Sequence, residues 1–194
     1  MAHPLTTAPP AARSGIPALE RFIARFIIRR YVRANPLELA PSLLRAQQRE
    51  LLAMISAAGP SATRRVQIKR LRGLEASSTN YSLVMVAEHL ALVNQDLAAA
   101  LESLKAGRTF PLVVQTANYK PSPGVTLNAA VEHLNAANAR LTVELADTAS
   151  IRGSRVTHAH PWFGDLSAET WASFGPFHQA LHLKQAHAIV AGLR

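Results

Sequence analysis

The chain has 194 residues, of which 48% are hydrophobic and 17% charged, so it fits one folded domain and is unlike an intrinsically disordered chain. It contains no cysteine, which excludes disulfides, a cysteine nucleophile and thiolate metal ligands. Its formal net charge is +9, but no helix-turn-helix, zinc-finger or RNA-binding signature accompanies the basic residues. We therefore expect no specific nucleic-acid binding.

Residues 1–15 are rich in Pro, Ala and Thr and are expected to form a disordered tail, with a single domain over residues 16–194. Residues 16–32 predict a helix that has an apolar stripe with arginines set off it. The stripe consists of Ile16, Leu19, Phe22, Ile23, Phe26, Ile27 and Tyr31. A basic amphipathic helix can lie on a membrane surface, but packing of the stripe on its own domain is the favoured interpretation. The stripe is also compatible with a homodimer.

No apolar run approaches the ~20 residues that a membrane span needs. The first residues also lack the basic start, apolar run and small-residue cleavage site of a secretory signal. The expectation is a cytoplasmic protein without a membrane span.

Four further helices follow from apolar residues at helical spacing. They are predicted at about 42–57, 82–105, 126–147 and 167–191, with Ser82 and Ser167 as helix-capping residues. Between them, residues 60–80 form a connector with a short basic helix near 66–71, residues 108–125 an irregular crossover, and residues 148–166 a loop. Strand patterns are weak everywhere, and Thr109–Thr116 is the only candidate. The predicted fold is all-α: a four-helix bundle with a long crossover and an additional N-terminal helix.

Two histidines of the last predicted helix are spaced for shared ligation. His178 and His182 are four residues apart, so both imidazoles leave the same face, about 40° apart. Trp171, Phe174 and Gln185 share that stripe, which is expected to face the interior of the bundle. This is a spacing at which two side chains can hold one metal ion.

His89 lies among Met85, Val86 and Val93 on another inward-facing helical stripe. Three inward histidines from two helices can supply a facial set of nitrogen ligands and leave other coordination positions open. For His89 taken alone, a hydrogen-bonded core histidine is the commoner outcome; the combination with His178 and His182 favours a metal site. His3, His133, His158, His160 and His187 are expected to lie in the tail, on the surface or in a loop.

The order of these motifs resembles the DinB-like superfamily. Residues 80–82 (NYS) followed by 87–90 (AEHL), and then HPWFGDLSAETW and HQALHLKQ near the C-terminus, are similar to its two histidine-bearing helices. The resemblance covers about residues 41–193. This chain departs from it at Leu183, where many relatives carry a second adjacent histidine, and at Tyr81, where tryptophan is usual.

The resemblance implies a four-helix bundle and a divalent metal (nickel, zinc or iron) held by His89, His178 and His182. It also implies a small-molecule substrate, and for some relatives a low-molecular-weight thiol cosubstrate such as bacillithiol, mycothiol or glutathione. Three functions remain open at this point. They are a metal-dependent enzyme (a thiol S-transferase or a hydrolase), a bundle that binds metal or a small ligand without turnover, and a structural bundle with hydrogen-bonded core histidines.

Overall fold

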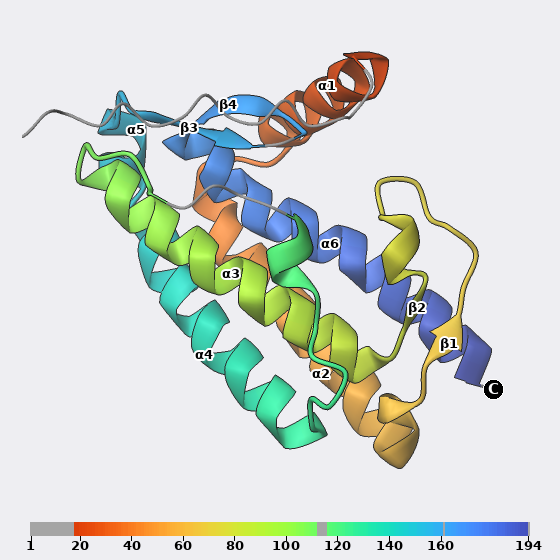
Figure 1. Ribbon diagram of the computed structural model, residues 1–194. Coiled ribbons are helices and arrows are strands. Elements are labelled where there is room, and N and C mark those ends of the chain that lie inside the picture. The colour runs from red at the N-terminus through yellow and green to blue at the C-terminus, as the bar shows by residue number, and fades with distance from the viewer. Residues whose placement is uncertain (1–17, 112–115, 161, 194) are drawn as a thin grey trace, which may run out of the picture.

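The computed structural model describes residues 18–111, 116–160 and 162–193, so the predicted tail at residues 1–15 lies outside it (Figure 1). The helices are α1 (Ala18–Ala34), α2 (Ala40–Ala58), α3 (Leu83–Lys105), α4 (Leu127–Ala146), α5 (Thr148–Gly153) and α6 (Ala168–Leu193). Short strands are β1 (Val66–Gln67), β2 (Asn80–Tyr81), β3 (Thr157–His160) and β4 (Gly164–Ser167). Single 3₁₀ turns are η1 (Leu37–Leu39), η2 (Gly59–Thr63), η3 (Ala76–Ser78) and η4 (Thr116–Tyr119).

Helices α2, α3, α4 and α6 form a four-helix bundle, which confirms the predicted fold class (Figure 1). Each of these helices packs against two others, in the closed order α3, α4, α2, α6. The connection between α3 and α4 is the long crossover, and α1 lies across the α6 side of the bundle (Figure 1).

The capping residues explain where the bundle helices begin. The Ser82 hydroxyl accepts a hydrogen bond from the Met85 N–H at 3.1 Å, and the Ser167 hydroxyl accepts one from Thr170 at 3.3 Å. Both residues therefore satisfy a backbone donor that the helix itself leaves unpaired, as predicted. Gly59 ends α2 with a φ of +53°, a conformation that glycine adopts without steric cost.

The core is divided into two apolar clusters along the bundle axis. One surrounds the N-terminal half of α3 and the C-terminal half of α6, and the other surrounds the opposite halves. Between them lies a fully buried amide cluster of Asn94, Asn138 and Gln179. This arrangement places α3 and α6 antiparallel and side by side, which brings the two predicted histidine helices together.

The connections differ from the predictions. Residues 66–71 hold strand β1 rather than a short basic helix, and β1 pairs with β2 in an antiparallel manner. Residues 148–166 are not simply a loop, because α5 is followed by the hairpin of β3 and β4. The weak strand candidate at Thr109–Thr116 is not a strand at residues 109–111, and residues 112–115 lie outside the described part of the chain.

Helix α1 packs on the bundle by one edge of the predicted stripe and by Ile28, which lies outside that stripe. Ile28 is 1% exposed, whereas Phe22 and Phe26 of the predicted stripe are 70% and 63% exposed. Of the stripe residues whose side chains are described, Ile23 and Ile27 line a cavity against the bundle and Tyr31 packs on Phe177 at a centroid distance of 5.1 Å, whereas Phe22 and Phe26 face away from the domain. Among the described residues, no helix is both long and apolar enough to cross a lipid bilayer.

Candidate metal centre

His89 is held from α3 by a backbone carbonyl of the crossover. Its Nδ1 lies 2.7 Å from the carbonyl oxygen of Tyr119, which belongs to the turn η4. Because a carbonyl oxygen can only accept, Nδ1 must carry the hydrogen and donate it. The neutral ring then has a free electron pair on Nε2.

His182 is held in the same way by a side-chain amide. Its Nδ1 lies 2.6 Å from Oε1 of Gln185, and the Nε2 amide of Gln185 donates to the carbonyl oxygen of Ser78 at 2.7 Å. The bond to Ser78 fixes which end of the amide is the oxygen, so Nδ1 of His182 is the donor. The free electron pair of His182 is therefore also on Nε2.

His178 completes the cluster one helical turn before His182. Its ring stacks on Phe174 with a centroid distance of 5.3 Å and an interplanar angle of 24°. Its Nδ1 is buried and has no hydrogen-bond partner among the described residues, and its Nε2 lies 3.1 Å from Nε2 of His182. The residue itself is half-buried.

The Nε2 atoms of this histidine cluster face one another across a small space. The Nε2 atoms of His89 and His182 are 3.1 Å apart, and one ligand atom from each of the three residues lies within 4.8 Å of the others. His89 and His182 cannot hydrogen-bond to each other in the neutral form, because both present an electron pair. Two nitrogens that are each about 2.1 Å from one ion are at most about 4.2 Å apart, so the two 3.1 Å separations fit shared coordination.

Burial keeps these rings neutral. It lowers the pKa of His178 and of His182 well below the ordinary value, and the neighbouring histidines lower both further. Burial also lowers the pKa of His89, against smaller opposing effects of the Tyr119 carbonyl and Glu75. Neutral imidazoles are the form that binds metal ions, so the cluster is prepared for a cation near pH 7.

A cavity of about 720 Å³ opens beside the cluster, and all three histidines line it. Its size is in the range of small-molecule sites. Tyr119 and Asp96 line the cavity as well, and the Tyr119 hydroxyl donates to the Asp96 carboxylate at 3.1 Å. Burial and the Asp96 charge both raise the pKa of Tyr119, so its hydroxyl remains protonated and acts as a donor. Taken together, the histidine cluster and this cavity could hold a metal ion in contact with a small molecule.

His160 lies at another part of the same cavity, although the sequence suggested only a loop residue. It ends β3, is 9% exposed, and packs its ring against Trp171 and Phe174 at centroid distances of 5.3 and 5.0 Å. Burial, with a smaller contribution from His158, lowers the pKa of His160 to about 3. His158 lies in the same strand, and its carbonyl accepts the Trp171 indole N–H at 3.0 Å.

His133 and His187 do not line the cavity. His133 bridges Glu88 and Gln95 at 3.1 and 2.9 Å and is only partly exposed, so it is less solvated than predicted. His187 is exposed, as predicted, and pairs with Glu50 at 2.6 Å. His3 is outside the described residues.

Sequence reasoning missed Tyr119 and Ser78. The Tyr119 carbonyl accepts from His89 and the Ser78 carbonyl accepts from Gln185, and a backbone carbonyl has no signature in the residue type. Gln185 was found because it shares the helical stripe of the histidines.

The crystal structure of TT2238, a four-helix bundle protein, is similar to this chain, with a TM-score of 0.55 and 26% identity. The match covers 78% of this chain and 98% of TT2238. No protein-family model matches the chain, and no curated protein matches it. The similarity supports the four-helix bundle and assigns no activity.

Proposed function

We propose that this chain is a metal-dependent enzyme of the DinB-like superfamily, in which His89, His178 and His182 hold one divalent transition metal. The observation that carries the proposal is the pair of fixed tautomers. Tyr119 and Gln185 each take the Nδ1 hydrogen of a histidine, so two free electron pairs point at each other 3.1 Å apart. A cation between them converts this unfavourable contact into ligation.

The ligand set narrows the identity of the metal. Three neutral imidazoles without thiolate or carboxylate suit nickel, zinc or iron better than magnesium or calcium, which prefer oxygen ligands. When bound, such an ion supplies Lewis acidity, which lowers the pKa of a thiol or water molecule that it coordinates. The chain's own residues orient the ligand rings and, through Phe174 and the cavity walls, keep bulk water from part of the site.

The absence of cysteine determines where the thiol of a thiol-dependent transferase would come from. A protein without cysteine cannot supply its own thiolate, so a thiol nucleophile must arrive as a small cosubstrate. The cavity has room for such a molecule together with an electrophile. A hydrolase that activates water is the nearest variant, and a bundle that binds metal and ligand without turnover is the alternative.

Elemental analysis of tag-free protein purified without added metal tests the metal centre. We expect near one equivalent of a transition metal in the wild type and less than a tenth of that in the His178→Ala/His182→Ala double variant. His133→Ala is the matched control, because it removes a histidine that pairs with Glu88 outside the cluster, and it should keep the metal.

Absence of metal from a folded wild type, even after incubation with nickel and zinc, would overturn the proposal. If metal is present, turnover of an electrophile with glutathione, mycothiol or bacillithiol separates the enzyme from the binding bundle. We expect the double variant to lose at least a thousandfold in rate. Metal without turnover of any thiol or hydrolysable substrate would favour the alternative.

A further inference from the structure

The cavity beside the histidine cluster is elongated. On α3 it is lined by His89, Val93, Leu97 and Ala100, and on α6 by His182, His178, Phe174 and Trp171. In each series the first and last residues are eleven positions apart, which is about 16 Å at the rise of an α-helix. The helices are antiparallel, because His89 faces His182 at one end and Leu97 lies against Gly175 further along. The cavity therefore runs along both helices away from the histidines.

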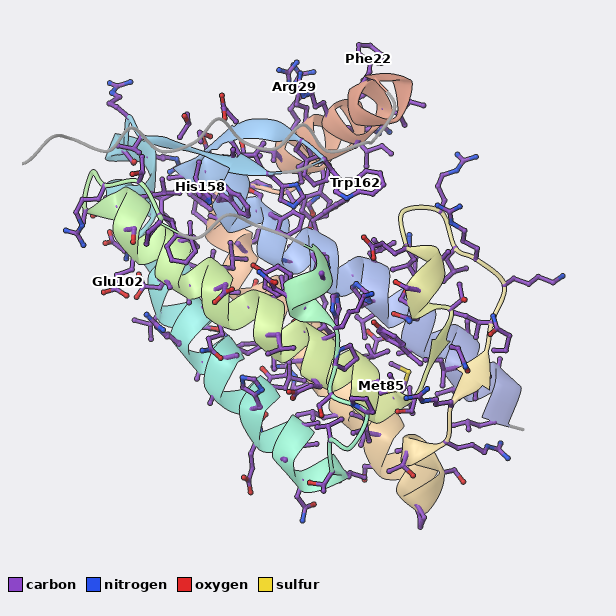
Figure 2. The ribbon with its side chains drawn as sticks, in the orientation of Figure 1. Phe22, Arg29, Met85, Glu102, His158 and Trp162 are labelled. Atoms are coloured by element: carbon purple, nitrogen blue, oxygen red, sulfur yellow. The ribbon has the colours of Figure 1, made fainter. Side chains whose placement is uncertain are left out.

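The far end of the cavity is apolar apart from the buried His160 and is covered by elements outside the bundle. Ile23 and Ile27 of α1 and Trp162 and Phe163 of the β3–β4 hairpin line it. The Arg25 Nε donates to the Phe163 carbonyl at 2.9 Å, which fastens α1 to the hairpin. Figure 2 shows Trp162 on the bundle side of α1, while Phe22 and Arg29 point away from the bundle.

The histidine end is polar and has an excess of positive charge. Arg70, Arg72 and Lys120 line it, against the two carboxylates of Glu75 and Asp96. Both carboxylates already accept a hydroxyl hydrogen bond, Glu75 from Ser77 at 3.2 Å and Asp96 from Tyr119 at 3.1 Å. Each carboxylate thus already has a donor inside the protein, and the excess of one positive charge favours an incoming anion.

We propose that the substrate of this site is an anionic amphiphile with an extended apolar body. The apolar body lies between α3, α6 and α1, and the anionic head lies at the histidine end beside Arg70 and Arg72. This assignment rests on the proposed function for the chemistry at the head. A compact polar substrate would leave the apolar walls unfilled, and polar groups placed against them would lose hydration without gaining partners.

The two tryptophans of the chain, Trp162 and Trp171, both line the cavity, so intrinsic fluorescence reports occupancy. The metal-loaded protein is titrated with octanoate, dodecanoate and dodecylammonium, each below its aggregation concentration. Burial of one methylene favours binding by about fourfold. We expect dodecanoate to bind at least tenfold more tightly than octanoate, and at least tenfold more tightly than dodecylammonium.

Substitutions on two different helices test where the apolar body lies. Ala24→Phe on α1 and Ala100→Phe on α3 place a larger side chain in the apolar end of the cavity. Each should weaken dodecanoate binding at least tenfold and leave the affinity for octanoate unchanged. Val143→Phe is the matched control, because Val143 is 68% exposed on α4 and does not line the cavity; it should change neither affinity. Circular dichroism verifies folding, and if one of the two cavity variants misfolds, the other decides.

Variants at the head test the charge preference. Arg70→Gln/Arg72→Gln should reduce the preference for dodecanoate over dodecylammonium to less than threefold. The proposed apolar body would be contradicted if the wild type bound octanoate and dodecanoate with equal affinity. It would also be contradicted if Ala24→Phe and Val143→Phe had the same affinities for these two ligands. Equal affinities of the wild type for dodecanoate and dodecylammonium would contradict the proposal that the substrate has an anionic head.

The substrate class and the metal centre can fail separately. The His178→Ala/His182→Ala variant should keep the dependence on chain length, because the apolar end is built from other residues. A wild type that holds metal but shows no chain-length dependence overturns the substrate class alone. Chain-length dependence in a protein that holds no metal overturns the metal centre alone.

Discussion

The bundle contains two clusters of buried polar side chains. In both, hydrogen-bonding groups that are shielded from water need partners, and the two clusters meet this need in different ways. In the amide cluster, Asn94 donates to Asn138 at 2.6 Å and to Gln179 at 3.1 Å, and Gln179 donates to the Leu44 carbonyl at 2.8 Å. In the histidine cluster, the outer nitrogens of His89 and His182 are satisfied but the inner ones oppose each other.

The difference suits a structural role for the amide cluster and the proposed metal-binding role for the histidine cluster. Amides carry donors and acceptors, so three of them can pair largely among themselves and join α3, α4 and α6. The neutral imidazoles of His89 and His182, whose tautomers are fixed, offer only acceptors to each other, and a cation between them would satisfy both. The direction of the free electron pairs of a buried polar side chain therefore says more about its role than its burial does.

Breaking the amide cluster should cost stability and spare the metal. Asn138→Leu removes the acceptor of Asn94 and a donor to Gln179, both fully buried, so we expect the free energy of unfolding to fall by about 3 kcal/mol. Urea unfolding measures this change, and elemental analysis should still find the metal. Asn135→Leu on the surface of the same helix is the control and should change stability by less than about 0.5 kcal/mol. Loss of metal in Asn138→Leu would contradict the separation of roles.

Removing one outer partner of the histidine cluster should instead weaken metal binding. Gln185→Leu leaves all three imidazoles but deletes the acceptor that fixes the His182 tautomer. Outer partners of this kind contribute about 10–100-fold in metal affinity. Competition with a metal-binding dye measures the change, and an unaltered affinity would show that Gln185 does not orient the ligand.

The smallest expected effect concerns His160, which is buried beside the cluster without belonging to it. Its pKa is about 3 in the folded chain, against an ordinary value of 6.5, so the unfolded chain binds the extra proton as pH falls below 6.5. As pH falls from 6.5 to 3, His160 therefore lowers the free energy of unfolding. The reduction is about 1.4 kcal/mol at pH 5.5 and almost nothing at pH 7.5.

His160→Phe should reduce the difference in unfolding free energy between pH 7.5 and 5.5 by that amount. Urea unfolding at both pH values, with a chelator present so that metal release does not contribute, gives the comparison. An identical pH difference in the variant and the wild type would show that His160 is protonated in the folded chain.

The sequence predicted the parts of this molecule that depend on periodicity. Apolar spacing placed the bundle helices to within a few residues, and the positions of His89, His178 and His182 on inward faces brought them together as expected. Ser82 and Ser167 were found as capping residues because a hydroxyl before an apolar run has a specific physical use.

Contacts between distant segments could not be predicted in this way. The β3–β4 hairpin is built from four-residue strands that are too short to show a clear alternation, and the stripe on α1 gave a period without saying which face would meet the bundle. Both of these elements line the cavity, so its apolar end could not be predicted from the sequence.

The outer partners of the histidines have a thermodynamic consequence. The carbonyl of Tyr119 comes from the α3–α4 crossover, and the amide of Gln185 is held by the carbonyl of Ser78 in the α2–α3 connector. An ion at the cluster would thus be coupled to the conformation of two long connections rather than only to the rigid helices. Such coupling is reciprocal: whatever orders these connections raises the affinity for the ion, and the bound ion makes their local opening less favourable by the same free energy.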